Sequence, residues 1–282
     1  MQPLKPACTA EYRGRFAPSP TGPIHFGSVV TALASYLDAR AHDGAWLVRI
    51  EDLDKPREQP GAAESILMAL TALGMQSDEP VVLQSQRAEL YRTALDTLKR
   101  TGLVYGCACA RRDIAECHCH DVVRPGRLPR AWRFRAPAES VSFNERRLGW
   151  MRGLARDTTV LRADGIFAYA LAVVVDDADQ GITHVVRGAD LLETAAAQVA
   201  LQTALGVASP EYLHVPLVVD ERGRKLSKQN HAPPVDLTRP AEVLRNALQF
   251  LGQPDAAGDD VHTILKSATA NWSPETMPQI SC

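Results

Sequence analysis

Apolar and polar positions alternate along the first hundred residues in a pattern that predicts short strands followed by amphipathic helices. Residues 12–17 and 45–50 are mostly apolar and short enough to be buried strands. Apolar positions recur at helical spacing in three further segments. We expect one helix to begin with Ser28 as its capping residue, and two others to span 60–73 and 86–100. This order predicts an α/β fold with a parallel sheet.

The alternation is interrupted in the middle of the chain. Residues 102–157 are rich in Cys, Arg, Pro and Gly and predict only short strand-like pieces, such as 131–135. Regular apolar segments return at 169–176 and 182–187. We therefore expect an insertion into the α/β domain.

The last third of the chain predicts three further elements. Asp190, followed by Glu193 three positions later, resembles a capping box and predicts a helix that runs to Gly206. Residues 213–219 predict a strand and 240–251 a helix. The remaining tail has no readable pattern.

Composition places the chain among globular proteins. With 282 residues, of which 45% are hydrophobic and 23% charged, it can bury a real core, which excludes a disordered tail, a collagen-like repeat and a disulfide-stapled small protein. No apolar run reaches the roughly 18–20 residues that span a bilayer. The N-terminal segment MQPLKPACTAEYR lacks the apolar core of a signal peptide. We therefore expect a cytoplasmic protein that does not enter a membrane.

Charge is distributed unevenly, although the net charge is only −2. Residues 111–162 contain twelve arginines and six acids, so this segment carries +6 and the rest of the chain −8. A basic face on an acidic body suits a phosphate backbone. A solvated arginine-rich surface explains the charge alone equally well.

Four of the six cysteines fall within thirteen residues, a clustering that indicates a metal site rather than disulfides in a cytosolic chain. The cluster consists of Cys107, Cys109, Cys117 and Cys119, with His118 and His120 interleaved. An empty, reduced cluster is the alternative interpretation. Cys8 and Cys282 have no assignable role.

Two polar loops carry candidate chemistry. The first, RFAPSPTGPIHFGS, leads from a strand to a helix start, where a helix N-terminus favours phosphate. There Gly27 permits close approach of a nucleotide, and His25 can donate to phosphate oxygens. The second, KLSK, offers Lys225 and Lys228 to a triphosphate. Taken singly, the first is more often a structural histidine and the second a solvated charge run.

Together these segments resemble the glutamyl-tRNA synthetase family of class I aminoacyl-tRNA synthetases. The resemblance extends from about residue 12 to 228 and includes IEDLD (50–54), LAVVVDD (171–177) and ITHVVRG (182–188). It implies a Rossmann-type parallel sheet and activation of an amino acid with ATP and Mg²⁺. We expect a monomer, although the sequence alone does not settle the oligomeric state. The implied organisation is a first half of the catalytic domain in 1–101, a zinc-containing arginine-rich insertion in 102–157, a second half with the KLSK loop in 158–235, and a short helical segment in 236–282.

Three features are more similar to a shortened branch of this family. They are the segment HFGS, with Ser28 where many members have a second histidine, the segments GIFAYALA and RGADLL, and the 54 residues after Lys228. Full-length members carry anticodon-reading domains there, which we expect this chain to lack. The branch transfers glutamate to queuosine in the anticodon of tRNA(Asp), so the implied partners are ATP, L-glutamate and queuosine-bearing tRNA(Asp).

Two other functions compete with this interpretation. A compact glutamyl-tRNA synthetase would charge the 3′ end of tRNA(Glu). A non-catalytic zinc RNA-binding module would not require ATP groups, so the presence of both HFG and KLSK argues against it.

The resemblance also implies roles for individual residues. In the glutamate pocket, Arg187 would hold a carboxylate, Glu51 the ammonium group, and Tyr169 would supply a hydroxyl and an apolar wall. The rest of this pocket would be Arg15, Phe16, Ala17, Pro18 and Ser19. ATP would contact His25, Gly27, Ser28, Lys225 and Lys228, with His25 and Lys228 as catalytic residues. Structural ion pairs are the alternative for these charged groups.

The implied zinc site departs from the family pattern. That pattern is C-x-C followed by a Tyr and a Cys, and Ala115 stands where the Tyr is expected. Cys107, Cys109 and Cys119 match. We choose Cys117 as the fourth ligand of a structural Zn²⁺, and His118 and His120 remain alternatives.

Overall fold

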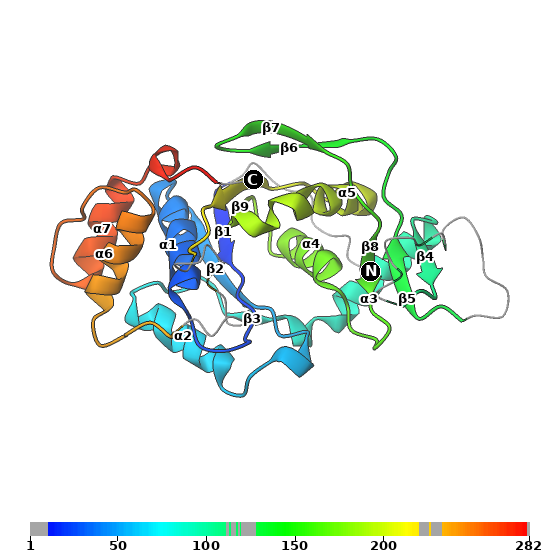
Figure 1. The fold of residues 1–282 in the computed structure, drawn as a ribbon, viewed down its shortest axis with the longest axis horizontal. Coiled ribbons are helices and arrows are strands. Elements are labelled where there is room, and N and C mark those ends of the chain that lie inside the picture. The colour runs from blue at the N-terminus through cyan, green and yellow to red at the C-terminus, as the bar shows by residue number, and fades with distance from the viewer. Residues whose placement is uncertain are drawn as a thin grey trace.

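A parallel sheet lies at the centre of the molecule (Figure 1). The computed structural model describes residues 11–110, 113, 117, 119, 128–219, 226 and 233–280. In spatial order the strands are β3 (Val82–Leu83), β2 (Ala45–Ile50), β1 (Arg13–Phe16), β9 (His184–Gly188) and β10 (Glu211–Val215). β9 runs beside β1, where the Thr183 amide donates to the Arg13 carbonyl at 3.0 Å. The expected α/β class with a parallel sheet is confirmed.

Helices cover both faces of this sheet (Figure 1). One core is formed with α1 (Phe26–Ala41), α2 (Ala62–Ala72), α6 (Pro240–Phe250) and α7 (Val261–Ala270). The opposite side carries α3 (Ala88–Arg100), α4 (Tyr169–Asp179) and α5 (Ala195–Leu205). Short 3₁₀ turns occupy Lys55–Arg57, Gln84–Gln86, Ala189–Thr194 and Pro274–Thr276. No helix in the described part of the chain is long and apolar enough to cross a membrane.

The two-residue period of the strands decides which side chains meet α4. In β2, Trp46 and Val48 face the α1 core, whereas Arg49 points to the other face and meets the acidic end of α4. In β1 the same alternation sends Phe16 to the α1 core and Arg15 to α4. Two arginines are therefore buried between the sheet and one helix.

The segment 102–157, expected as an insertion, contributes to two sheets. β4 (Val104–Cys107), β5 (Ala131–Phe134) and β8 (Thr158–Leu161) form a separate antiparallel sheet. The hairpin of β6 (Val141–Glu145) and β7 (Gly149–Gly153) instead extends the sheet of β9 and β10, because β6 pairs with β10 at Glu145 and Tyr212 (Figure 1).

Asp38 of α1 joins distant parts of the chain. Its carboxylate is fully buried and accepts hydrogen bonds from the Tyr12 hydroxyl, the Arg146 guanidinium and, at 2.9 Å, the Trp272 indole. These partners come from the residue before β1, the turn of the β6–β7 hairpin and the segment after α7. A buried carboxylate needs such partners because desolvation of a lone charge is costly.

Several element boundaries differ from the sequence prediction. Ser28 does not cap α1: His25 is the capping residue, and its ring accepts from the Ser28 amide. Asp190 does not open the predicted helix either, because 189–194 is a 3₁₀ turn and α5 begins only at Ala195. The helix end at Gly206, in left-handed conformation with φ 69°, is confirmed.

Candidate active site

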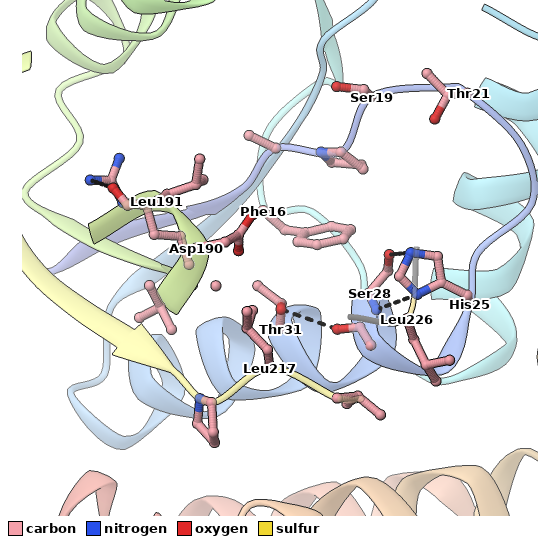
Figure 2. A pocket seen from close by; sticks show the side chains of 18 of the residues that line it. Phe16, Ser19, Thr21, His25, Ser28, Thr31, Asp190, Leu191, Leu217 and Leu226 are labelled. Atoms are coloured by element: carbon pink, nitrogen blue, oxygen red, sulfur yellow. Dashed lines mark hydrogen bonds between the residues drawn. The ribbon is translucent and has the colours of Figure 1, made fainter. Parts of the chain in front are cut away.

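A pocket of about 470 Å³ opens at the carboxyl ends of β1 and β9 and the N-terminus of α1. Side chains from these segments and from the 3₁₀ turn after β9 surround one hollow (Figure 2). It brings together ten of the residues predicted from the sequence, namely Arg15, Phe16, Ala17, Pro18, Ser19, His25, Gly27, Ser28, Tyr169 and Arg187. Glu51 lines an adjoining pocket of about 250 Å³ that shares Ser19, Thr21 and Tyr169 with the first. Lys225 and Lys228 lie outside the described residues.

The α1 N-terminus forms one wall of the pocket. The His25 ring lies 3.2 Å from the Ser28 amide through Nδ1 and 3.1 Å from the Ser28 hydroxyl through Nε2 (Figure 2). A Cβ on Gly27 would lie 3.3 Å from this ring and 3.7 Å from the Leu226 carbonyl oxygen, so glycine leaves room here. The amide of Leu226, the second residue of KLSK, donates to the Val218 carbonyl at 2.7 Å. The described residue of that loop therefore lies beside the helix start.

Buried ion pairs support another part of the pocket wall. Arg15 pairs with Asp177 through two contacts, at 3.1 and 3.3 Å, and Arg49 reaches the same carboxylate at 2.8 Å. Burial opposes ionisation of Asp177, but the Arg15 and Arg49 charges outweigh it and hold its pKa below the usual value. Asp177 thus fixes the Arg15 guanidinium at the edge of the pocket.

Glu51 is the exception in this wall. Its side chain is 8% exposed, its nearest cation is Arg49 at 3.6 Å, and its Oε1 has no hydrogen-bond partner. Burial raises the pKa of Glu51 to about 7, although Arg49 and Arg15 favour the ionised form. A buried carboxylate oxygen without a hydrogen bond, at the edge of a pocket, is suited to an ammonium ligand.

Arg187 reaches the pocket from the end of β9. Its guanidinium lies over the Tyr212 ring, 4.8 Å from the centroid, and donates to His214, Gln198 and the Leu191 carbonyl. Three of its five N–H groups are used in this way, so two are left for a ligand.

Some pocket residues were not predicted. Thr21, Thr31, Asp190, Leu191 and Leu217 also line it (Figure 2). Thr21 lies within the RFAPSPTG segment and could have been included on that ground. Asp190 was assigned to helix capping, because its spacing to Glu193 matches a local signal that the 3₁₀ turn does not use.

The four predicted cysteines lie together. Their sulfur atoms are all within 4.8 Å of one another, with Cys107 and Cys117 at 3.5 Å and Cys109 and Cys119 at 3.6 Å. A tetrahedral Zn–S bond of about 2.3 Å requires sulfur atoms roughly 3.8 Å apart, so the donor set and its spacing fit a metal ion. His118 and His120, the alternative ligands, lie outside the described residues.

Comparison with known proteins identifies the family. Residues 11–147 and 128–263 match the family described as tRNA synthetases class I (E and Q), catalytic domain. The chain belongs to this family. It is therefore a class I tRNA synthetase, an enzyme of the ligase class, and the predicted membership of the glutamyl-tRNA synthetase group is confirmed.

Curated relatives narrow this class I tRNA synthetase further. The chain is 50% identical to a protein of Burkholderia cenocepacia, over 93% of this chain and 96% of the relative. It is 47% identical to a protein of Dechloromonas aromatica, over 96% and 97% of the two chains. Both relatives are named glutamyl-Q tRNA(Asp) synthetase, which matches the shortened branch inferred from the sequence.

Solved structures agree on the fold of this synthetase. A glutamate-tRNA synthetase from Elizabethkingia anophelis superposes with a TM-score of 0.79 at 24% identity, over 95% of this chain and 67% of that one. A glutamate tRNA ligase from Elizabethkingia meningosepticum, determined in complex with its amino acid, gives a TM-score of 0.78 at 25% identity over 95% and 66%.

Proposed function

We propose that the chain activates L-glutamate with ATP to glutamyl-adenylate and transfers the glutamate to queuosine in the anticodon of tRNA(Asp). The observation that carries this proposal is a single pocket lined both by Arg15 and Arg187 and by the N-terminus of α1. Such a pocket joins cationic groups for carboxylates to a helix N-terminus for phosphate. The names of relatives that match nearly the whole chain support the queuosine acceptor.

The charges around the pocket suit glutamate. Arg15 and Arg187 supply two guanidinium groups for its two carboxylates, and Glu51 supplies the anion for its ammonium group. Tyr169 lies where both pockets meet. Arg15 and Arg187 lie on strands, Tyr169 begins α4 and Glu51 directly follows β2, so these side chains hold the substrate with little reorganisation.

Activation requires attack of the glutamate α-carboxylate oxygen on the α-phosphorus of ATP. The new O–P bond forms as the bond to the β-phosphate oxygen breaks, and pyrophosphate leaves. His25 and the main chain at Gly27 hold the phosphates, and by resemblance Lys225 and Lys228 neutralise the leaving group. Mg²⁺ bound with ATP would supply additional charge neutralisation.

We assign the acceptor nucleoside to a second cavity next to this site. A pocket of about 760 Å³ lies between the β6–β7 hairpin, the segment 154–159 and the start of α5, and it shares Tyr169 with the first pocket. Along and beside β7, every second side chain is exposed, namely Leu148, Trp150, Arg152, Leu154 and Arg156, and the last three of these line the pocket. Trp150 is 77% exposed. An aromatic ring such as Trp150 can stack on a base, and arginines such as Arg152 and Arg156 can bind phosphates, as in contacts to single-stranded RNA.

We assign the sulfur cluster as a structural zinc site with Cys107, Cys109, Cys117 and Cys119 as ligands. Cys107 ends β4, and the other cysteines follow it, so one ion would fix the start of the arginine-rich insertion. Metal analysis should give one zinc per chain. Cys117→Ser should lower both the zinc content and the melting temperature, and full zinc retention in that variant would make His118 or His120 the fourth ligand.

Transfer of labelled glutamate tests the proposed function. Purified tRNA(Asp) with and without queuosine, and tRNA(Glu), are each incubated with enzyme, ATP and labelled glutamate. Label on queuosine-bearing tRNA(Asp) alone is the expected result. Label on tRNA(Glu) would establish a compact glutamyl-tRNA synthetase instead. Glutamate-dependent ATP–pyrophosphate exchange without tRNA is the accompanying measurement, and its absence together with RNA binding would indicate a non-catalytic module.

A further inference from the structure

A buried chain of hydrogen bonds runs behind Arg187, away from the pocket. Arg187 Nε donates to His214 Nε2 at 3.1 Å, and His214 Nδ1 lies 3.3 Å from Glu145 Oε1. Arg187 is 4% exposed, and His214 and Glu145 are completely buried. The three residues come from β9, β10 and β6, which are adjacent strands of one sheet.

The chemistry of Arg187 fixes the state of the histidine. A guanidinium group only donates hydrogen bonds, so His214 Nε2 must carry a lone pair. The proton of neutral His214 then resides on Nδ1 and is donated to Glu145. Burial lowers the pKa of His214, although the Glu145 hydrogen bond raises it, so the ring is neutral at neutral pH.

Glu145 is itself held by the main chain. Oε1 accepts from the His214 amide at 2.7 Å, and Oε2 accepts from the amides of Arg147 and Leu148 at 2.9 and 2.8 Å. Glu145 of β6 lies opposite Tyr212 of β10 in the sheet, and His214 follows Tyr212 two residues later on β10. The carboxylate is therefore a fixed anchor for the imidazole ring.

Each remaining contact of Arg187 limits its rotation further. Nη1 donates to Gln198 at 2.6 Å and Nη2 to the Leu191 carbonyl at 3.1 Å, which leaves one N–H on each terminal nitrogen. The His214 contact alone anchors Nε, the atom about which the guanidinium would turn. Loss of this acceptor would leave the guanidinium held only through its terminal nitrogens and would widen the range of directions of the two free N–H groups.

We propose that His214, oriented by Glu145, is a positioning residue that aims Arg187 at a substrate carboxylate. The inference rests on the proposed binding of glutamate by Arg187. A positioning role of this kind affects ground-state binding of glutamate more than the binding of ATP.

Substitution at His214 tests the proposal. His214→Phe keeps the ring volume but removes the acceptor, and it should raise the Kd and the KM for glutamate at least tenfold while the KM for ATP changes less than twofold. His214→Gln should restore most of the affinity, because the Gln amide oxygen is the same number of bonds from Cα as His Nε2. The matched control is His184→Phe on β9. The ring of His184 stacks on the ring of Tyr12, with their centroids 4.0 Å apart, and phenylalanine preserves this stacking. This variant should leave the Kd for glutamate unchanged.

Calorimetry of glutamate binding to the full-length protein, without ATP, separates failure of the proposed function from failure of the positioning role of His214. If the wild-type protein binds no glutamate, the proposed function fails. If the wild-type protein binds and His214→Phe binds equally well, only the positioning role fails. Nitrogen NMR of the wild-type protein gives a result that does not depend on a variant folding. A proton on Nδ1 of His214 supports the chain of hydrogen bonds, and a proton on Nε2 overturns it.

Discussion

The two walls of the active-site pocket are built in different ways. On the side that we propose for the amino acid, Arg15 and Arg187 extend from strands and are held by buried partners such as Asp177 and His214. On the side that we propose for the nucleotide, the α1 N-terminus presents His25 and Gly27, and a loop carrying Leu226 lies next to them. The first wall consists of long charged side chains, and the second mainly of helix start and main chain.

This difference separates two kinds of recognition. To distinguish glutamate from other amino acids, a pocket must bind the substrate carboxylates with guanidinium groups in fixed positions. Fixing these guanidinium groups requires buried counter-charges. Phosphates can be bound by main-chain amides and mobile cations that do not require a deep anchor. We therefore expect substitutions in the first wall to affect both stability and glutamate binding, and those in the second wall to affect ATP-dependent steps.

The largest effect is expected at Asp177. Asp177→Asn removes the charge that compensates two buried guanidinium groups, so it should lower the free energy of unfolding by about 3–5 kcal/mol and weaken glutamate binding. Asp179→Asn is the matched control on the same helix, because Asp179 is 39% exposed and pairs with Arg87 near the surface. It should cost less than about 1 kcal/mol. Equal losses in chemical denaturation would contradict the asymmetry.

A pH-dependent effect is expected at Glu51. The pKa of its carboxyl group is about 7 in the folded protein and 4.5 in the unfolded chain. Between pH 4.5 and 7 the folded protein therefore binds more protons than the unfolded chain. Because of this difference, the Glu51 carboxyl group lowers the free energy of unfolding as pH rises through this range. The stability of Glu51→Gln relative to wild type should therefore increase by up to about 3 kcal/mol from pH 4.5 to above 7.

The same carboxyl group gives a kinetic prediction. Glu51 must be ionised to hold the ammonium group, so the wild-type KM for glutamate should fall as pH rises through about 7. Glu51→Gln should have a high KM without this dependence. A pH-independent KM in the wild-type enzyme would exclude Glu51 from ammonium binding.

On the nucleotide side, Gly27→Ala should have an intermediate effect. The new methyl group would lie 3.3 Å from the His25 ring, so the ring or the helix start must shift. A displacement that costs about 1.4 kcal/mol would raise the KM for ATP roughly tenfold. The Kd for glutamate measured without ATP should not change, and a parallel loss of glutamate binding would show that the two walls are coupled.

The smallest effect is expected for Ser28→Ala. It removes the 3.1 Å contact between the Ser28 hydroxyl and the His25 ring but keeps the bond from the Ser28 amide. If the lost hydrogen bond contributes about 1 kcal/mol or less to the stability of the transition state, its removal should slow pyrophosphate exchange about fivefold at most. A decrease of a hundredfold would mean that the hydroxyl contacts substrate directly.

Sequence reasoning predicted the parts of the fold that depend on local pattern. The strand Ala45–Ile50 and the helix Pro240–Phe250 follow from apolar periodicity, and both are confirmed within a residue or two. The pocket residues from Arg15 to Ser28 were found because an ordered set of motifs resembled a family. Their roles remain predictions.

Long-range contacts could not be predicted in the same way. No local signal in Glu145 or His214 indicates that they meet, because β6 pairs with β10 across 69 positions of sequence. The apolar run in α4 is compatible with a strand or a helix by pattern alone, and the structure shows a helix whose Asp177 contacts Arg15 of β1 and Arg49 of β2. The Asp190 capping prediction was wrong because tertiary contacts of the 3₁₀ turn outweigh a local motif.

Asp38 has a consequence for the order in which the chain folds on the ribosome. Its partners emerge in the sequence Tyr12, Arg146 and Trp272, so the helix that carries it is synthesised more than a hundred residues before its only charged partner among the described residues. Until Arg146 has emerged, burial of this carboxylate leaves a lone negative charge in the core. The N-terminal half therefore cannot complete its packing around Asp38 until Arg146 has emerged, and the Trp272 contact is added later, after α7 has been synthesised.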